Sequence, residues 1–168
     1  MNKRLSKSGR ALESFERICR RQALPLTIQR RQILAVLLGR TDHPTADQVF
    51  EEVQARLPGI SRTTVYRVLN TLVRLGVIRM VCHPGASVRF DANLEPHHHL
   101  VCLYCGKMSD WDDPRLNALP LPNTRRAGFK IVDYTVHFRG ACVDCMKKSK
   151  ATHRTKTAPR LRPRKVRG

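Results

Sequence analysis

The chain has 168 residues, 41% of them hydrophobic, which is enough for one ordinary domain or two small ones with a real core and argues against disorder throughout. Its formal net charge of +19 implies a polyanionic partner, and nucleic acid fits better than a membrane surface. No apolar run approaches the roughly 18 residues of a membrane span, and the basic first residues lead into no apolar segment of an export signal, so we expect a soluble, cytoplasmic protein.

The first half of the chain predicts four helices, because apolar residues recur there at helical spacing between capping and stop residues. Thr27 and Ser61 are expected N-caps, and Thr45 is expected to form a capping box with Gln48. The third helix carries several acidic residues that would repel phosphate, so we expect it to face away from DNA. The expected ranges are 11–23, 28–38, 46–57 and 62–75.

The fourth predicted helix has an apolar seam and a basic polar face. Two short strands, 77–81 and 86–90, are expected after it around the turn His83-Pro84-Gly85. Helices followed by such a hairpin form a winged helix-turn-helix, and no acidic residue stands between Glu52 and Asp91. The alternative is a solvated face with an arginine excess. We predict DNA contacts from Arg62, Thr63, Tyr66, Arg67 and Asn70.

The second half is rich in predicted strands. They are expected at 97–103, 108–111 and 129–139, with a short helix near 114–119. Beyond Cys145 no periodic apolar pattern remains, so we expect a disordered basic tail that can also attract phosphate non-specifically.

Charge is divided unevenly along the chain. Residues 1–89 carry 16 basic and 6 acidic side chains, residues 90–146 carry 6 and 7, and residues 147–168 carry 10 and none. A neutral middle between two basic ends is typical of a DNA-binding part, a protein–protein part and a basic tail.

Six cysteines without an export signal favour metal ligation over disulfides. Cys102-Leu-Tyr-Cys105 and Cys142-Val-Asp-Cys145 are two Cys-x-x-Cys pairs, and four thiolates are the usual shell of a structural zinc ion. The competing interpretation is a redox dithiol, for which one pair would suffice. Zinc would supply folding energy to a domain too small to rely on its core. Cys19 and Cys82 lie outside this pattern, and ordinary packing is expected for both.

A second set of candidate ligands is Asp91, His97, His99 and Asp110, with His43 upstream. His97 and His99 point to the same face of a strand. If the first cysteine pair forms a hairpin turn, Asp110 lies opposite His97, and two imidazoles converge with a carboxylate. Three nitrogens and two carboxylate oxygens suit Fe(II), Mn(II) or Zn(II). The alternative is surface histidines with no ligand role, and spacing alone does not include His43.

Six segments stand in the order and at the spacing of the motifs of one known family. They are His43-Pro-Thr-Ala-Asp47, Thr64-Val-Tyr-Arg67, Arg89-Phe-Asp91, His97-His-His99, Cys102-x-x-Cys105-Gly-Lys107 and Cys142-x-x-Cys145. On these segments the chain resembles the ferric uptake regulator family from about Leu12 to Lys147, which is most of its length.

The resemblance implies a metal-dependent repressor that is a homodimer and inserts Tyr66 and Arg67 into the major groove of palindromic, double-stranded operator DNA. It implies structural zinc on the four cysteines and a regulatory Fe(II) or Mn(II) ion between the two halves of the chain. Binding of that ion would favour the DNA-competent posture of the halves. By motif position the regulatory ligands are His43, Asp91, His97, His99 and Asp110.

The fold class expected on these grounds is α+β. A winged helix-turn-helix DNA-binding domain is expected first, followed by a small α/β dimerisation domain with a four-cysteine zinc site. The expected boundaries are 1–90 for the DNA-binding domain, with a basic arm at 1–10, 91–146 for the metal-binding dimerisation domain, and 147–168 for the disordered tail.

Two aspartates in the regulatory set bear on the signal. Iron sensors of the family usually carry glutamate where Asp91 and Asp110 stand, whereas the peroxide-sensing branch has aspartate at both positions. That branch implies Fe(II)-dependent oxidation of His43 or His97 by peroxide, and repression by Mn(II) without oxidation. A cysteine typical of the zinc-sensing branch is missing beside Asp91. A further family site is incomplete, because Pro96 and Tyr134 occupy positions often held by histidine.

Other functions fit the sequence less well. An iron- or zinc-responsive uptake repressor is the alternative within the family. A zinc-dependent hydrolase would need a general base or nucleophile motif, and none stands out, so we expect no enzyme, no small-molecule substrate and no membrane partner. A constitutive architectural DNA-binding protein, with inert histidines and a dominant tail, is the alternative of another class.

Overall fold

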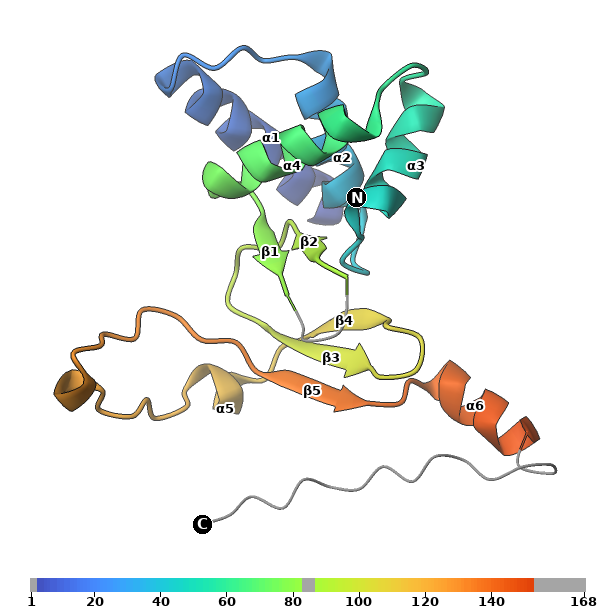
Figure 1. The fold of residues 1–168 in the computed structure, drawn as a ribbon. Coiled ribbons are helices and arrows are strands. Elements are labelled where there is room, and N and C mark those ends of the chain that lie inside the picture. The colour runs from blue at the N-terminus through green and yellow to red at the C-terminus, as the bar shows by residue number, and fades with distance from the viewer. Residues whose placement is uncertain (1–2, 83–86, 153–168) are drawn as a thin grey trace.

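The structure is a computed structural model that describes residues 3–82 and 87–152 and consists of a helical part followed by a small sheet part (Figure 1). Within these ranges, no helix combines the length and the apolarity needed to cross a bilayer. The helices are α1 (Lys3–Arg21), α2 (Ile28–Gly39), α3 (Ala46–Arg56), α4 (Arg62–Arg74), α5 (Pro114–Asn117) and α6 (Val143–Thr152), with a 3-10 turn η1 (Arg125–Ala127). The strands are β1 (Arg79–Val81), β2 (Arg89–Asp91), β3 (His98–Cys102), β4 (Met108–Trp111) and β5 (His137–Gly140).

Helices α2, α3 and α4 begin at the capping residues that the sequence predicts. Thr27 and Ser61 each accept a hydrogen bond from the backbone N–H three residues further on. Thr45 and Gln48 form the reciprocal capping box. These bonds satisfy N–H groups that have no partner inside a helix, and the three predicted caps are confirmed.

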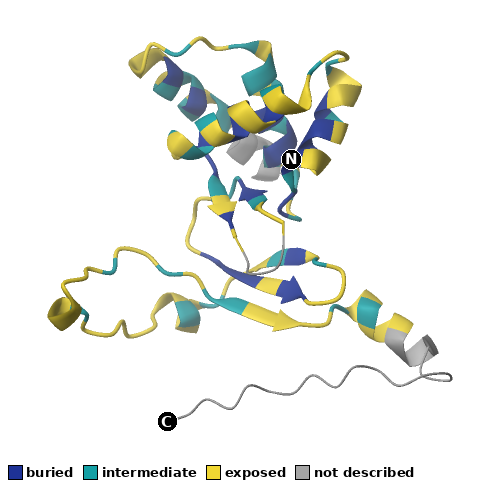
Figure 2. Cartoon of the chain, viewed as in Figure 1, coloured by how far each residue is buried: buried dark blue, intermediate teal, exposed yellow. Residues whose placement is uncertain are grey.

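One apolar core joins the four helices of the helical part to the hairpin that follows (Figure 2). The seam predicted for α4 is buried, whereas the residues predicted to contact DNA are exposed on its other face. Phe15 of α1 is fully buried against this core, which therefore fixes the direction in which the exposed face of α4 points. The seam consists of Val65, Val68, Leu69 and Leu72, and its main partners are Ile33, Leu34, Val36, Leu37, Val49, Phe50, Val53, Ile78 and Phe90.

The hairpin of β1 and β2 follows α4 directly, with Met80 opposite Phe90 in an antiparallel pair. Its second strand also contacts the loop before α3, because the Phe90 N–H donates to the Pro44 carbonyl at 3.0 Å. This arrangement confirms the predicted winged helix-turn-helix. Both strands are shorter than predicted, and the predicted turn His83-Pro84-Gly85 lies outside the described residues.

The sheet part has the strand order β4-β3-β5. Strands β3 and β4 are antiparallel, whereas β5 runs parallel to β3 with His137 beside His99. The predicted α+β fold class is confirmed. Apart from the helical core, the buried apolar cluster of the described residues consists of Val81, Val101 and Met108. So small a cluster contributes little to stability, and the sheet part depends on other interactions.

The strand predicted over 129–139 forms only at its end. Phe129 and Val132 are 65% and 86% exposed, and in the described chain nothing packs against them as a neighbouring strand would. The N–H of Val136 donates to Nδ1 of His98 at 3.2 Å, so a side chain takes the place of a ladder partner. The prediction of a long strand is therefore wrong, and only His137–Gly140 pairs.

Helices α1 and α6 extend beyond their predicted limits. Helix α1 begins at Lys3, so the predicted basic arm is largely helical, as its good helix-forming residues allow. Helix α6 runs through Lys147 to Thr152, where a disordered tail was expected. The negative charge of Asp144, in the first turn of α6, interacts favourably with the positive end of the helix dipole and so stabilises this helix. Residues 153–168 of the predicted tail lie outside the described residues.

The Leu69→Ala substitution is expected to lower the free energy of unfolding by about 2 to 5 kcal/mol, because it leaves a cavity beneath α4. Asn70→Ala, at an exposed position of the same helix, is the matched control and should change it by less than about 0.5 kcal/mol. Chemical denaturation followed by circular dichroism measures both. Equal losses in the two variants would contradict the described core.

Candidate functional site

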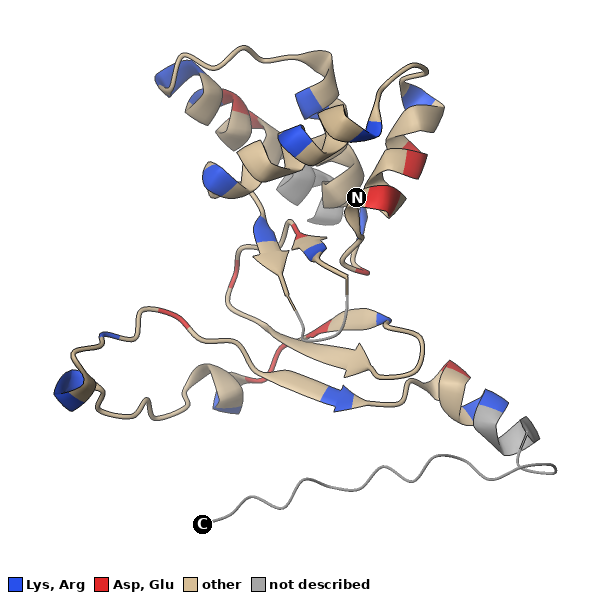
Figure 3. Cartoon of the chain, in the orientation of Figure 1, with Lys and Arg blue, Asp and Glu red and all other residues tan. Residues whose placement is uncertain are grey.

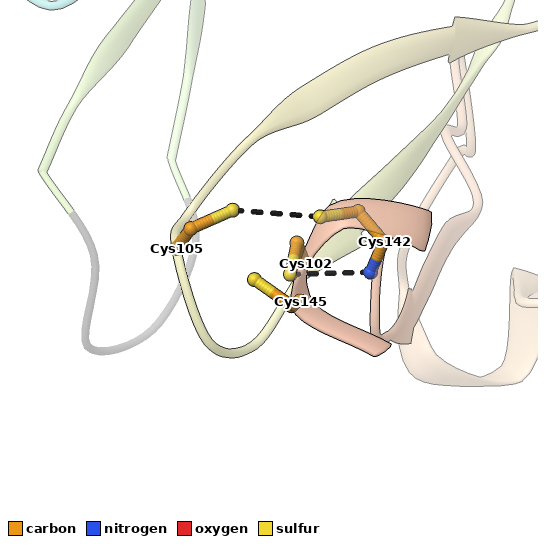
Figure 4. Close-up of side chains that lie close together, drawn as sticks. All are labelled: Cys102, Cys105, Cys142 and Cys145. Carbon is orange, nitrogen blue, oxygen red and sulfur yellow. Dashed lines mark hydrogen bonds between the residues drawn. The ribbon is translucent and has the colours of Figure 1, made fainter. Parts of the chain in front are cut away.

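The four cysteines of the two Cys-x-x-Cys pairs lie together at one end of the sheet part (Figure 4). Cys102 ends β3, Cys105 lies in the following turn, Cys142 precedes α6 and Cys145 lies in its first turn. All four sulfur atoms are within 4.8 Å of one another, and Sγ of Cys105 is 3.7 Å from Sγ of Cys142. Four thiolates on one tetrahedral zinc ion would be roughly 3.8 Å apart, because Zn–S bonds are about 2.3 Å long.

Backbone hydrogen bonds shape this thiol cluster before any metal binds. The Cys102 N–H donates to the Lys107 carbonyl at 2.8 Å, and the Gly106 N–H donates to the Cys102 carbonyl at 3.0 Å. Gly106 has φ of 69°, a left-handed conformation that glycine adopts readily. The N–H of Leu103 donates to the Gly140 carbonyl at 2.8 Å and so brings the second cysteine pair to the first.

The pKa values of the cysteine thiols differ within the thiol cluster. Burial favours the neutral thiol of Cys102, but backbone N–H groups of Cys142, Cys105 and Tyr104 point at its sulfur and lower its pKa to about 6. Contact with the neighbouring thiols, Cys142 first, raises the pKa of Cys145 to about 12. A thiolate is therefore available in this cluster near neutral pH, which metal binding requires.

The two remaining cysteines behave differently from each other. Cys19 is buried in the helical core, as predicted, and burial raises the pKa of its thiol. Cys82 is exposed directly after β1, so the expectation of ordinary packing is wrong for this residue.

The predicted regulatory ligands come from four separate places in the chain. His43 lies in the loop between α2 and α3 with φ of 52°, Asp91 ends β2, His97 precedes β3, His99 lies within it, and Asp110 lies on β4. The first four are 3% to 6% exposed, and the side chain of Asp110 is 34% exposed. We call these five residues the sensor cluster.

Distances within the sensor cluster match those around a single ion. Nε2 of His97 is 3.0 Å from Oδ2 of Asp91 and 3.1 Å from Nε2 of His99. Nε2 of His43 is 2.9 Å from Oδ1 of Asp110 and 3.7 Å from Oδ2 of Asp91. Donor atoms of one ion stand roughly 3 to 4 Å apart, because metal–nitrogen and metal–oxygen bonds are about 2.1 Å long.

The donor atoms of the sensor cluster also face inward without satisfying one another. In the described chain, neither Nε2 of His43 nor Oδ2 of Asp91 makes a hydrogen bond of acceptable geometry, although both are buried. Nδ1 of His97 lies 2.8 Å from the Glu95 carbonyl, which can only accept, so Nδ1 keeps its hydrogen and Nε2 is the nitrogen left to bind a metal ion. Unpaired buried polar atoms are costly, and a cation bound by Nε2 of His43 and Oδ2 of Asp91 would satisfy both atoms.

The ionisable groups of the sensor cluster differ in their readiness to bind a cation. Burial opposes the charge on Asp91, but the imidazoles of His43 and His97 outweigh it and hold its pKa well below the usual range. The Asp91 carboxylate raises the pKa of His97 to about 8, whereas burial and the neighbouring imidazoles lower that of His99 to about 3. An anionic Asp91 and a neutral His99 can therefore bind a metal ion directly, whereas His97 must lose a proton near neutral pH when a metal ion binds.

The predicted register between β3 and β4 is wrong by two residues. Asp110 lies opposite His99, not opposite His97. The ladder ends at Val101 and Met108, so that the turn includes Gly106 and Lys107 and its centre lies further along the chain than the midpoint of the cysteine pair. Asp110 still reaches the cluster, with Oδ1 at 3.7 Å from Nε2 of His97.

Arg89 supports the sensor cluster from inside the molecule. Its Nη1 donates to the carbonyl of His43 at 2.8 Å. Its Nη2 lies so close to the thiol turn that a Cβ on Gly106 would stand 3.4 Å from it. Arg89 therefore links the loop of one ligand to the turn that carries two cysteines.

Two further residues at the sensor cluster were missed from the sequence. Asn93 donates its backbone N–H to Oδ1 of Asp91 at 2.7 Å and its side-chain amide to Oδ2 of Asp110 at 3.1 Å. The ring of His137 packs edge-on against that of His99, with centroids 5.0 Å apart. Only the parallel pairing of β5 brings His137 there, and no local sequence signal predicts that pairing.

A cavity of about 480 Å³ borders the sensor cluster. Side chains of α1 and α2 line it together with three residues of the sensor cluster. Lining residues include Phe15, Ile18, Leu37, His43, Asp91 and Asp110.

The exposed face of α4 carries all five residues predicted to contact DNA, namely Arg62, Thr63, Tyr66, Arg67 and Asn70. Basic residues but no acidic ones lie along α4, whereas α1 and α3 carry residues of both signs (Figure 3). One acidic residue of α3 nevertheless reaches α4, because Arg62 forms an ion pair with Asp47. The guanidinium of Arg62 also lies 4.4 Å from the centre of the Phe50 ring.

Known proteins resemble this chain over most of its length. The ferric uptake regulator family model matches residues 21–139. The peroxide-responsive repressor PerR of Staphylococcus aureus is 30% identical over 129 residues, which are 77% of this chain and 87% of that protein.

Solved structures of ferric uptake regulators share the fold of this chain. The Helicobacter pylori ferric uptake regulator matches with a TM-score of 0.69 at 23% identity, over 83% of this chain and 93% of that one. The ferric uptake regulator of Francisella tularensis with iron matches with a TM-score of 0.63 at 26% identity, over 73% of this chain and 95% of that one.

Arg89→Ala is expected to weaken binding of a divalent metal ion at the sensor cluster by about 10- to 100-fold, because the His43 loop loses its anchor. Mn(II) titration followed by electron paramagnetic resonance of the free ion measures this affinity. Arg56→Ala, which removes an exposed pair with Glu52, is the control and should bind as the parent does. Metal retained on the thiols shows that the variant is folded, and parental Mn(II) affinity in Arg89→Ala would contradict the role of Arg89.

Proposed function

Because the chain belongs to the ferric uptake regulator family of metal-responsive regulators, we propose that it is a DNA-binding repressor that senses peroxide through Fe(II) or Mn(II) at the sensor cluster. Five of the six motifs that indicated this family in the sequence lie within the residues that the family model matches, and Cys142-x-x-Cys145 follows directly after them. Members of the family are transcriptional regulators, so the protein is not an enzyme. Acting on DNA, it is proposed to work in the cytoplasm.

The observation that carries the proposal is the origin of the sensor ligands in both parts of the chain. His43 comes from the helical part, whereas His97, His99 and Asp110 come from the sheet part, and Asp91 ends the hairpin between them. An ion held by all five residues would favour the posture in which they converge. If operator DNA also favours that posture, DNA and metal strengthen each other's binding by the same factor.

The four cysteines are proposed to hold structural zinc. Their sulfur spacing fits a tetrahedral thiolate shell, and the sheet part has little apolar core of its own. Zinc would join the end of β3 to the start of α6 and supply folding energy to this part. The thiol cluster is separate from the sensor cluster, so the two metals have separate ligands.

Peroxide is favoured as the signal by the two aspartates and by one relative. Both carboxylates of the sensor cluster are aspartate, as in the peroxide-sensing branch, and PerR of Staphylococcus aureus is a peroxide-responsive repressor. Fe(II) held by the sensor cluster would supply the electron-transfer chemistry for oxidation of a ligating imidazole by hydrogen peroxide, which Mn(II) would not. The cavity lined by His43, Asp91 and Asp110 is large enough to hold a molecule of peroxide beside the site. Likeness to a ferric uptake regulator with iron keeps iron sensing as the alternative, with zinc sensing as a further one in the family.

The partners proposed are a second copy of this chain and palindromic operator DNA. Large apolar side chains are exposed on the sheet part, among them Phe129 at 65%, and a second copy would cover them. A two-fold dimer presents two α4 helices, so the DNA it reads must repeat in inverted order. Tyr66 and Arg67 lie on the face that would enter each major groove.

Metal is expected to strengthen operator binding by about 5- to 150-fold, the usual size of such coupling. The operator is first selected from random double-stranded DNA with the Mn(II)-loaded protein, and gel shifts then compare Mn(II), Fe(II) under anaerobic conditions and chelator. His43→Ala should abolish the metal effect, while Cys82→Ser, an exposed control, should retain it. Affinity that never changes with metal would exclude a metal-gated repressor and leave an architectural DNA-binding protein.

Hydrogen peroxide is expected to add oxygen to His43 or His97 in the Fe(II)-loaded protein and to release operator DNA. Mass spectrometry of peptides containing these residues detects the mass increase, and the Mn(II)-loaded protein is the control, in which neither residue should change. Metal-dependent binding without oxidation of any sensor histidine would exclude peroxide and leave the iron or zinc alternative.

A further inference from the structure

Arg62 is held by two side chains of another helix in the free protein. It is the first residue of α4, directly after the N-cap Ser61. Its Nη1 pairs with Oδ1 of Asp47, the second residue of α3, and its guanidinium carbon lies 4.4 Å from the centre of the Phe50 ring. One carboxylate and one aromatic ring therefore fix both the position and the plane of the guanidinium.

This arrangement contributes little to the stability of the fold. The side chains of Arg62 and Asp47 are 55% and 57% exposed, and ion pairs so open to water are screened. A cation at the first position of a helix also opposes the helix dipole. Contacts that stabilise the fold so little are better explained by the way they orient the Arg62 guanidinium toward a partner.

The free edge of the held guanidinium has the geometry of a base-reading group. Asp47 occupies Nη1, and within the described part of the chain Nε and Nη2 make no hydrogen bond. These two nitrogens form a planar fork of N–H donors that matches the O6 and N7 acceptors of guanine in the major groove. The N-terminal residues of a recognition helix are those that contact base edges, and Arg62 opens α4.

We propose that Arg62 reads a guanine in each half of the operator and that Asp47 and Phe50 are positioning residues that hold it for this task. The proposal rests on the DNA-binding function proposed above and adds to it a specificity-determining residue. Tyr66 and Arg67 lie one turn further along α4, so the guanine lies to one side of the bases they contact.

Asp47 has a second consequence for specificity. Its carboxylate is paired with Arg62, which would otherwise pair with any nearby phosphate. The negative charge of Asp47 also repels phosphate directly. Asp47→Asn should therefore raise affinity for unrelated DNA while lowering discrimination. Arg62→Ala should remove the guanine preference, and Arg62→Lys should remove it while keeping the charge, because lysine has no fork.

The experiment selects binding sites from random double-stranded DNA with the full-length Mn(II)-loaded parent, Arg62→Ala, Arg62→Lys and Asp47→Asn. Arg74→Ala, an exposed arginine in the last turn of α4, is the matched control. Affinity for the parent's selected site and for scrambled DNA is then measured at several salt concentrations. Circular dichroism shows that each variant is folded, as the exposure of these side chains predicts.

The parent should select guanine at one symmetric position that both Arg62 variants lose, with discrimination there falling by roughly tenfold. Asp47→Asn should bind scrambled DNA more tightly and with a steeper salt dependence, and Asp47→Asn combined with Arg62→Ala should show the same sequence preference as Arg62→Ala. Arg74→Ala should keep the parent's sequence preference.

Selected sites that are the same for the parent and the Arg62 variants would overturn the inference while leaving the proposed function standing. An unchanged Asp47→Asn variant beside an altered Arg62→Ala variant would overturn the positioning role. A parent that selects no sequence, with or without Mn(II), would overturn the proposed function, and the inference would fall with it.

Discussion

The rest of the structure depends on a group of buried polar atoms that cannot satisfy one another. In the sensor cluster, Nε2 of His43 and Oδ2 of Asp91 are buried away from bulk water and make no hydrogen bond of acceptable geometry. Each unsatisfied buried polar group costs about 1 to 3 kcal/mol, so the chain has no reason to assemble this cluster for stability alone. The neighbouring elements hold it together, with Arg89 anchoring the loop of His43 and Asn93 bridging the two carboxylates.

The sheet part is under a different constraint, because it has almost no apolar core to stabilise it. Val81, Val101 and Met108 are too few to hold three strands and a helix. The four thiols lie where β3, its turn and the start of α6 meet, so one bound ion would tie these elements together. Arg89 lies against the same turn and belongs to β2, the strand that ends at Asp91. Zinc at the thiols would therefore also support the proposed regulatory site without sharing a ligand with it.

Local features of the fold were predictable from sequence, and features that depend on distant pairing were not. Thr45 and Ser61 mark helix starts because a cap acts within three residues, and the seam of α4 follows from helical spacing alone. The register of Asp110 was missed because it depends on how Gly106 closes the thiol turn. The cysteine pairs and sensor histidines could be named from spacing and family motifs, but His137 and the inward bond of Arg89 arise from contacts across 38 and 46 positions.

The parallel pairing of β3 with β5 has a consequence for the order of events during synthesis. A parallel neighbour cannot be reached by a tight turn, and here the chain makes a long excursion through α5 and η1 before β5 returns to the sheet. Cys102 and Cys105 can therefore take up their positions as soon as β3 and β4 have paired. Cys142 and Cys145 join them only after that long loop has closed, which is an entropically unfavourable and slow step. The thiol centre closes last, and a ribosome-bound chain that lacks its final segment holds only half of it.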